Sequence, residues 1–231
     1  MPVSRLLVLC VFLGLLIVGF LGWRDLSSRR QPKETSAPII DKEPVNFANR
    51  TFDPAARAAD MPPMTPGEDA ECDSNFLSNA SVGGESRQAD ATHATVTITQ
   101  IKVTLQLNIN IWVPTDVTQH VIEHENGHRQ ISEYYYQTAD KVAERIAATY
   151  MGKQVDITGT DLGAESGKML QQMATDITAE YSKELNPGPT QLLYDSITDH
   201  GRNEVVVKDA VAAALKNIAI ASTQPPTNPG N

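Results

Sequence analysis

A run of alternating apolar and polar side chains constrains the fold more than any other feature of this sequence. From 101 to 113 every odd-numbered residue is Ile, Val or Leu, and most even-numbered residues are Lys, Thr, Gln or Asn. A period of two is typical of a β-strand with one buried face. Val96 and Ile98 have the opposite phase, so we expect a bulge or tight turn near Thr99 and Gln100 that keeps one face buried.

Three helices are expected after this strand, which Pro114 ends. Their predicted ranges are Thr115 or Asp116 to about Met151, residues 160–185 and residues 203–221. Each has apolar residues at spacings of three and four, and the sequence Asn-Pro-Gly-Pro at 186–189 ends the second. The sequence therefore predicts an α+β fold, in which a small antiparallel sheet packs with one long helix and two further helices.

The middle of the first predicted helix carries an H-E-x-x-H motif at residues 124–128. Residues four apart lie on one face of a helix, so the imidazoles of His124 and His128 can converge on one cation. The apolar stripe of the helix passes through both positions, which places them on the side that faces the core. Glu125 lies beside this pair, where its carboxylate can take a proton from a zinc-activated water. The motif therefore predicts a Zn²⁺ site with Glu125 as general base.

Gly127 supports this interpretation. A glycine within a helix costs about 1 kcal/mol relative to alanine, so its presence indicates that another segment approaches closely. Two histidines and a carboxylate on one buried face are also expensive without a metal or a partner.

A third protein ligand is needed to complete a catalytic zinc site. His120 lies about 12 Å from His128 along the helix axis, which is too far. The metzincin class is excluded because Ile131 and Tyr134 occupy the positions of its additional glycine and histidine. The residues that stay open as third ligands are His93, His200, Glu165, Asp176 and Asp199.

The order of these features resembles a family of bacterial secreted, zinc-dependent proteases that was formerly catalogued as a domain of unknown function. The shared features are the strand, the H-E-x-G-H helix and a later Y-D-x-x-T-x-H-G segment, here residues 194–201. The resemblance covers about residues 91–221. It implies a zinc-dependent peptidase of the cell envelope, with His200 as the third zinc ligand beside His124 and His128.

Other residues of the later segment have two interpretations each. Tyr194 is a candidate catalytic residue that would stabilise an oxyanion or donate to the substrate carbonyl, and the alternative is a packing role. Asp195 or Asp199 could orient a ligand imidazole, and the alternative is a solvated loop charge.

The chain before the predicted strand is uneven. Residues 6–23 form an uninterrupted apolar stretch, which favours a signal anchor or transmembrane segment within residues 1–30; a cleaved signal peptide is the alternative. Residues 31–70 contain seven prolines and are expected to be a linker. The remaining prediction is a zincin-like metallopeptidase domain over 71–221 and a disordered tail over 222–231.

Composition excludes several partners. The chain has 28 acidic against 19 basic residues and a net charge of −9, which argues against nucleic acid and anionic lipid surfaces as ligands. Two cysteines, Cys10 and Cys72, exclude a disulfide framework. The expected partners are a protein or peptide substrate and, through the N-terminal segment, a membrane. The expected location is extracytoplasmic (periplasmic) and membrane-anchored, or secreted if the leader is cleaved.

Three functions are consistent with this sequence. The first is a zinc metallopeptidase of the cell envelope, the second a non-catalytic envelope binding or scaffold protein with a structural metal, and the third a hydrolase of cell-wall or other amides. Glu125 favours an enzyme, because a structural site needs no base beside its ligands.

Overall fold

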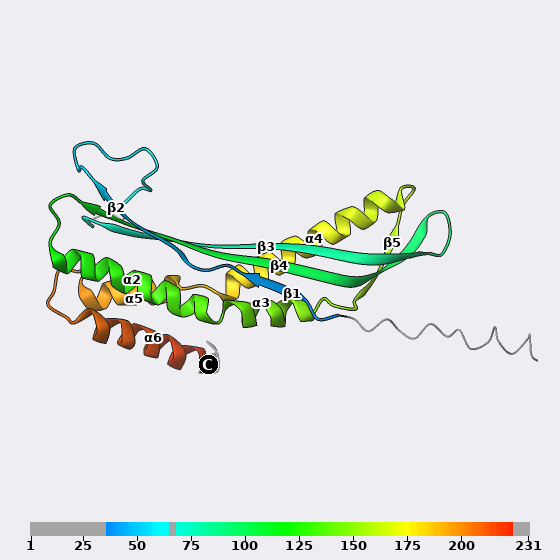
Figure 1. Ribbon diagram of the computed structural model, residues 1–231. Coiled ribbons are helices and arrows are strands. Elements are labelled where there is room, and N and C mark those ends of the chain that lie inside the picture. The colour runs from blue at the N-terminus through cyan, green and yellow to red at the C-terminus, as the bar shows by residue number, and fades with distance from the viewer. Residues whose placement is uncertain (1–35, 65–67, 224–231) are drawn as a thin grey trace, which may run out of the picture. The chain divides into compact units, whose positions relative to one another are not determined.

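A computed structural model of the chain describes residues 36–64 and 68–223, which form an α+β fold (Figure 1). The predicted fold class is confirmed. In chain order the elements are β1 (Ile39–Lys42), β2 (Asn46–Phe52), β3 (Glu71–Gln88), β4 (His93–Pro114), α2 (Gln119–Gln137), α3 (Ala139–Ala148), β5 (Gln154–Thr158), α4 (Leu162–Glu184), α5 (Gly188–Thr198) and α6 (Val207–Thr223).

The alternating run forms β4, the longest strand. Its apolar side chains from Ile101 to Ile111 are almost fully buried, while Thr104 and Gln106 on the other face are half-buried. The expected bulge is confirmed. Gly83 pairs with Gln100 and Gly84 pairs with Ile98, so Thr99 has no partner in β3 and the buried face changes phase there.

The sheet is mixed, and the prediction of an antiparallel sheet is wrong. β3 pairs antiparallel with β4 along nearly the whole of its length. The opposite edge of β4 is occupied in succession by β5, which is antiparallel, and by β1 and β2, which are both parallel to it. A strand of 22 residues is long enough to pair with several short strands on one edge.

The two parallel strands lie in the segment that we expected to be a linker. The prolines of this segment flank the strands and do not interrupt them, since Pro38 precedes β1, Pro44 separates β1 from β2 and Pro54 follows β2. Proline is compatible with these positions because it removes a backbone donor only where no ladder bond is needed. Residues 39–52 are therefore part of the sheet.

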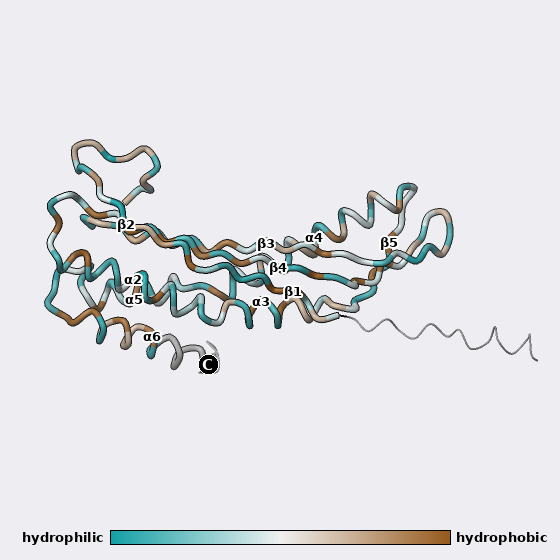
Figure 2. The backbone as a smooth tube through the Cα atoms, viewed as in Figure 1, coloured by the Kyte–Doolittle hydropathy of each residue, from teal (hydrophilic) through white to brown (hydrophobic). Residues whose placement is uncertain are grey.

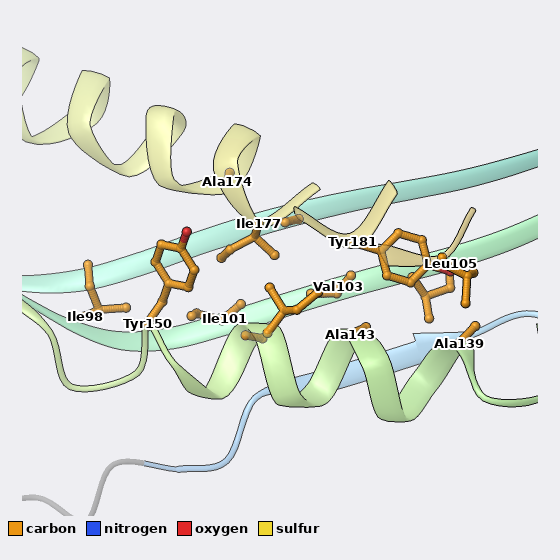
Figure 3. Close-up of a cluster of buried hydrophobic side chains, with 14 of the residues drawn as sticks. Ile98, Ile101, Val103, Leu105, Ala139, Ala143, Tyr150, Ala174, Ile177 and Tyr181 are labelled. Atoms are coloured by element: carbon orange, nitrogen blue, oxygen red, sulfur yellow. The ribbon is translucent and has the colours of Figure 1, made fainter. Parts of the chain in front are cut away.

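One face of the sheet carries the core. Figure 3 shows Ile101 and Val103 of β4 facing Ala143 of α3 and Ile177 of α4, and all four are at most 1% exposed. Figure 2 shows the corresponding alternation of hydrophobic and hydrophilic stretches along strands and helices. Small residues on α3 let this helix approach the strand closely.

The long helix predicted from about 115 to 151 is two helices. Thr138 has a non-helical backbone, and its N–H donates to the carbonyls of Tyr135 and Tyr136 as α2 ends. The threonine hydroxyl also donates to the Tyr135 carbonyl. The first helix begins later than expected, after Thr118, whose side chain accepts a hydrogen bond from the Val121 N–H.

α5 was not predicted. The Asn-Pro-Gly-Pro sequence does end α4, but Pro187 and Pro189 also stand at the beginning of α5. Proline is well tolerated in the first turn of a helix, where the missing N–H has no intrahelical partner. The segment that we interpreted as a loop therefore has a rigid helical backbone.

The predicted membrane segment and most of the predicted tail lie outside the described residues. Among the helices that are described, none is both long enough and apolar enough to cross a membrane.

We predict that a chain beginning at residue 36 folds with the stability of the longer chain, whereas one beginning at residue 53 is less stable by at least about 2 kcal/mol. The second chain lacks β1 and β2, and burial of Phe52 alone contributes roughly 1.5–3 kcal/mol. Denaturant unfolding followed by circular dichroism measures the difference. Equal stability of the two chains would contradict the assignment of residues 39–52 to the sheet.

Candidate metal centre

The H-E-x-x-H motif, residues 124–128, lies near the middle of α2 on the buried side of the helix. His124 and Glu125 are each 2% exposed and His128 is 9% exposed. Helical spacing brings the two imidazoles together, so that their Nε2 atoms are 3.2 Å apart. The predicted convergence of the two histidines on one point is therefore present.

Asp195 of α5 completes the group. Its Oδ1 lies 2.8 Å from His128 Nε2 and 3.5 Å from His124 Nε2. Three ligand atoms around a cation at about 2.0–2.1 Å in tetrahedral geometry are about 3.3 Å apart. The three observed distances lie around this value, so His124, His128 and Asp195 are positioned to bind a metal ion.

The hydrogen bonds of Gln191 determine which nitrogen of His128 is available. The Gln191 amide nitrogen donates to the His128 carbonyl and to Ser132 Oγ, so its Oε1 is the atom that faces His128 Nδ1 at 2.7 Å. An amide oxygen can only accept, and His128 Nδ1 must therefore carry the proton. The Nε2 atom then faces Asp195, and a proton or a metal ion between the two atoms stabilises their short separation.

Tyr194 fixes the position of α5 against α2, which lie side by side (Figure 1). Its ring stacks on His124 with centroids 5.0 Å apart, and its hydroxyl donates to the His124 carbonyl at 3.1 Å. A Cβ at Gly127 would overlap the Tyr194 hydroxyl. The close approach that we expected at Gly127 is confirmed, and the approaching group is Tyr194.

The turn after α5 also depends on contacts with the metal-binding helix. Gly201 has a φ of 72°, and a Cβ there would lie 2.8 Å from His124 Cγ. Asp199 and His200 before it have φ values of 48° and 55°, so the turn is left-handed over three residues. Only glycine combines this backbone with the close contact to His124.

The charges of the group are strongly coupled. Burial lowers the pKa of His128, but the hydrogen bond and charge of Asp195 outweigh it and raise that pKa to about 9. Burial would raise the pKa of Asp195, but hydrogen bonds from His124 and His128 hold it well below its usual range. In the absence of a metal, a proton on His128 therefore balances the charge of Asp195.

Glu125 projects into a pocket of about 280 Å³ that is also lined by His128 and Asp195. Burial raises its pKa to about 8, although the charge of His128 opposes the shift. Its Oε2 has no hydrogen-bond partner among the described residues. The carboxylate is thus held beside the metal-binding group with one oxygen free to interact with a ligand.

His200 does not join His124 and His128. Its Nδ1 lies 2.9 Å from Glu68 Oε1, and the third atom of the histidine group belongs to Asp195. The left-handed turn after α5 carries His200 away, because Asp195 precedes the turn and His200 is within it. The structure therefore places beside the two histidines a residue that we had considered only as an orienting group.

Tyr194 does not line the pocket. It is fully buried, and its hydroxyl donates a hydrogen bond to a backbone carbonyl. Of the two interpretations of Tyr194, this arrangement agrees with the packing role. The raised pKa of its hydroxyl follows from the same burial.

The other candidates of the sequence analysis lie elsewhere. His93 pairs with Asp90 beside the β3–β4 turn. Glu165 pairs with Lys168, and Asp176 accepts from Gln172, both on an exposed face of α4. His120, which the helical spacing had already excluded, lines a different pocket.

Gln191 and Glu68 are site residues that sequence analysis did not find. Neither belongs to a motif, and Glu68 is distant from His200 in the chain. A helical interpretation of residues 188–198 would have placed Gln191 and Asp195, four residues apart, on one face.

Comparisons with models of protein families, with curated proteins and with solved structures find no match to this chain. The family resemblance therefore stays a prediction.

We predict that Gly127→Ala destabilises the protein by about 1–3 kcal/mol, because the added methyl group overlaps Tyr194. Gly167→Ala in α4 is the matched control. Its Cβ would meet nothing within 4 Å, so this change should be neutral or stabilising by up to about 1 kcal/mol. Denaturant unfolding of both variants gives the comparison, and equal effects would contradict the packing of α5 on α2.

Proposed function

We propose that this protein is a zinc-dependent metallopeptidase in which His124, His128 and Asp195 hold the ion and Glu125 is the general base. The observation that carries the proposal is the group of three buried ligand atoms with an unpartnered buried carboxylate beside it. Two histidines and one carboxylate are a ligand set of catalytic zinc sites that leave one position open for water or substrate.

The bound zinc would supply Lewis acidity toward a substrate carbonyl and toward water. Glu125 then takes a proton from the attacking water at its Oε2 and returns it to the leaving amine. Gln191 keeps the His128 ring in the orientation and protonation state that a ligand needs, and Tyr194 does the same for the plane of the His124 ring.

The cell envelope is the location that we propose for this activity. The support is the apolar stretch at residues 6–23, which lies outside the described residues and stays a sequence-based prediction. The acidic composition of the chain agrees with a substrate that is neither nucleic acid nor lipid.

The ligand assignment predicts that Asp195→Asn weakens zinc binding by roughly 10²-fold or more, since even partners outside the ligand set contribute 10–100-fold. Asp199→Asn is the control, because Asp199 is exposed and asparagine tolerates its left-handed backbone. Competition with a chromophoric chelator measures both affinities, and mass spectrometry of the purified protein identifies the metal. Unchanged affinity in Asp195→Asn would exclude Asp195 as a ligand, and iron in place of zinc would favour an oxygen-dependent enzyme.

The catalytic assignment predicts that Glu125→Gln keeps the metal and lowers hydrolysis of an unstructured protein by roughly 10²-fold. Glu123→Gln is the matched control, since Glu123 lies two residues earlier on the exposed side of α2. Zinc content and rate are measured on the same preparations. Loss of zinc in Glu125→Gln would make this carboxylate a ligand, and absence of hydrolysis by the unchanged protein across varied peptides would favour a binding protein.

A further inference from the structure

Glu68 and His200 form a second set of potential ligands next to the first. Glu68 Oε1 lies 2.9 Å from His200 Nδ1, a distance at which one cation could contact both atoms. The Glu68 side chain is only 9% exposed and that of His200 is 38% exposed. The two residues are far apart in the chain, so the fold brings them together.

Asp195 belongs to both sets. Its carboxylate lies within 4.8 Å of the ligand atoms of Glu68 and His200, and also of those of His124 and His128. A carboxylate has two oxygens and can bind a separate cation with each. Asp195 therefore has the position of a bridging ligand.

The charge of the pocket exceeds what one divalent ion can neutralise. Four acidic residues line it, Glu68, Glu71, Glu125 and Asp195, and no lysine or arginine is among the described residues that do so. The carboxylates of Glu68, Glu125 and Asp195 alone exceed the charge of one divalent ion, and burial makes the excess negative charge costly. The same pocket holds Glu125 Oε2, a buried carboxylate oxygen without a hydrogen-bond partner among the described residues, which adds to this excess negative charge.

We propose that a second divalent cation binds between Glu68, Asp195 and His200, with Asp195 bridging it to the first ion. The inference rests on the proposed function for the first ion and goes beyond it. Two cations that share a carboxylate would lie about 3.5–4 Å apart, and together they could bind the attacking water and an oxygen of the substrate. The pocket would then favour substrates that present two oxygens, such as a peptide carbonyl next to a free carboxylate.

The test uses the full-length protein stripped of metal and titrated with Zn²⁺ or Co²⁺. The expected result is two equivalents per chain, with magnetic coupling between two Co²⁺ ions in the electron paramagnetic resonance spectrum. Glu68→Gln and His200→Asn should each lower the affinity for the second ion at least 10-fold, abolish the coupling and leave the affinity for the first ion within about threefold. Asparagine is chosen because it tolerates the left-handed backbone of His200.

His93→Asn is the matched control. It removes a histidine that lies 2.9 Å from a carboxylate, Asp90, outside the pocket, and it should leave two coupled ions. If the unchanged protein binds one ion and His200→Asn still binds it, the second site is overturned and the first is left intact. If the unchanged protein binds one ion and His200→Asn loses it, His200 is a ligand of that single ion. If the protein binds two ions that are not coupled, the second ion lies elsewhere. Each of these results overturns the inference. Binding of no ion would overturn the proposed function as well.

Discussion

The contact between Tyr194 and Gly127 determines how this site is assembled. The candidate metal ligands come from two helices that are separated in the chain by two further helices and a strand, so their relative position depends on how closely α2 and α5 approach. Glycine lets the tyrosine hydroxyl reach the backbone of α2, where it bonds the carbonyl of His124. One helical turn fixes the two histidines relative to each other, and this contact fixes Asp195 relative to both.

A chain of hydrogen bonds connects the same ligands to the sheet. Ser132 of α2 donates to Ser74 of β3 and accepts from Gln191, which in turn holds His128. β3 therefore contributes to the orientation of a ligand that it does not contact. The antiparallel pairing of β3 with the long strand β4 supports this arrangement, because alternate residues of β4 pack into the core on the covered face.

Burial of charge accounts for the chemistry of the pocket. Carboxylates and imidazoles that are removed from water lose solvation, and only a cation at the point where their ligand atoms meet restores it. His128 and Asp195 lie close together for this reason. Their proximity raises the pKa of His128 and lowers the pKa of Asp195. Glu125 lies in the same pocket, and its Oε2 has no hydrogen-bond partner among the described residues.

The sequence by itself determined the elements whose signals are local. The alternation of 101–113 predicted β4, the change of phase predicted its bulge, and the H-E-x-x-H spacing predicted two convergent histidines, since periodicity and helical geometry act over a few residues. Gly127 likewise predicted a close approach. Only the tertiary structure decided what approaches it, which strands join β4 from residues 39–52, and which carboxylate lies beside the two histidines. These outcomes depend on the packing of segments that are distant in the chain, which no local pattern in the sequence encodes.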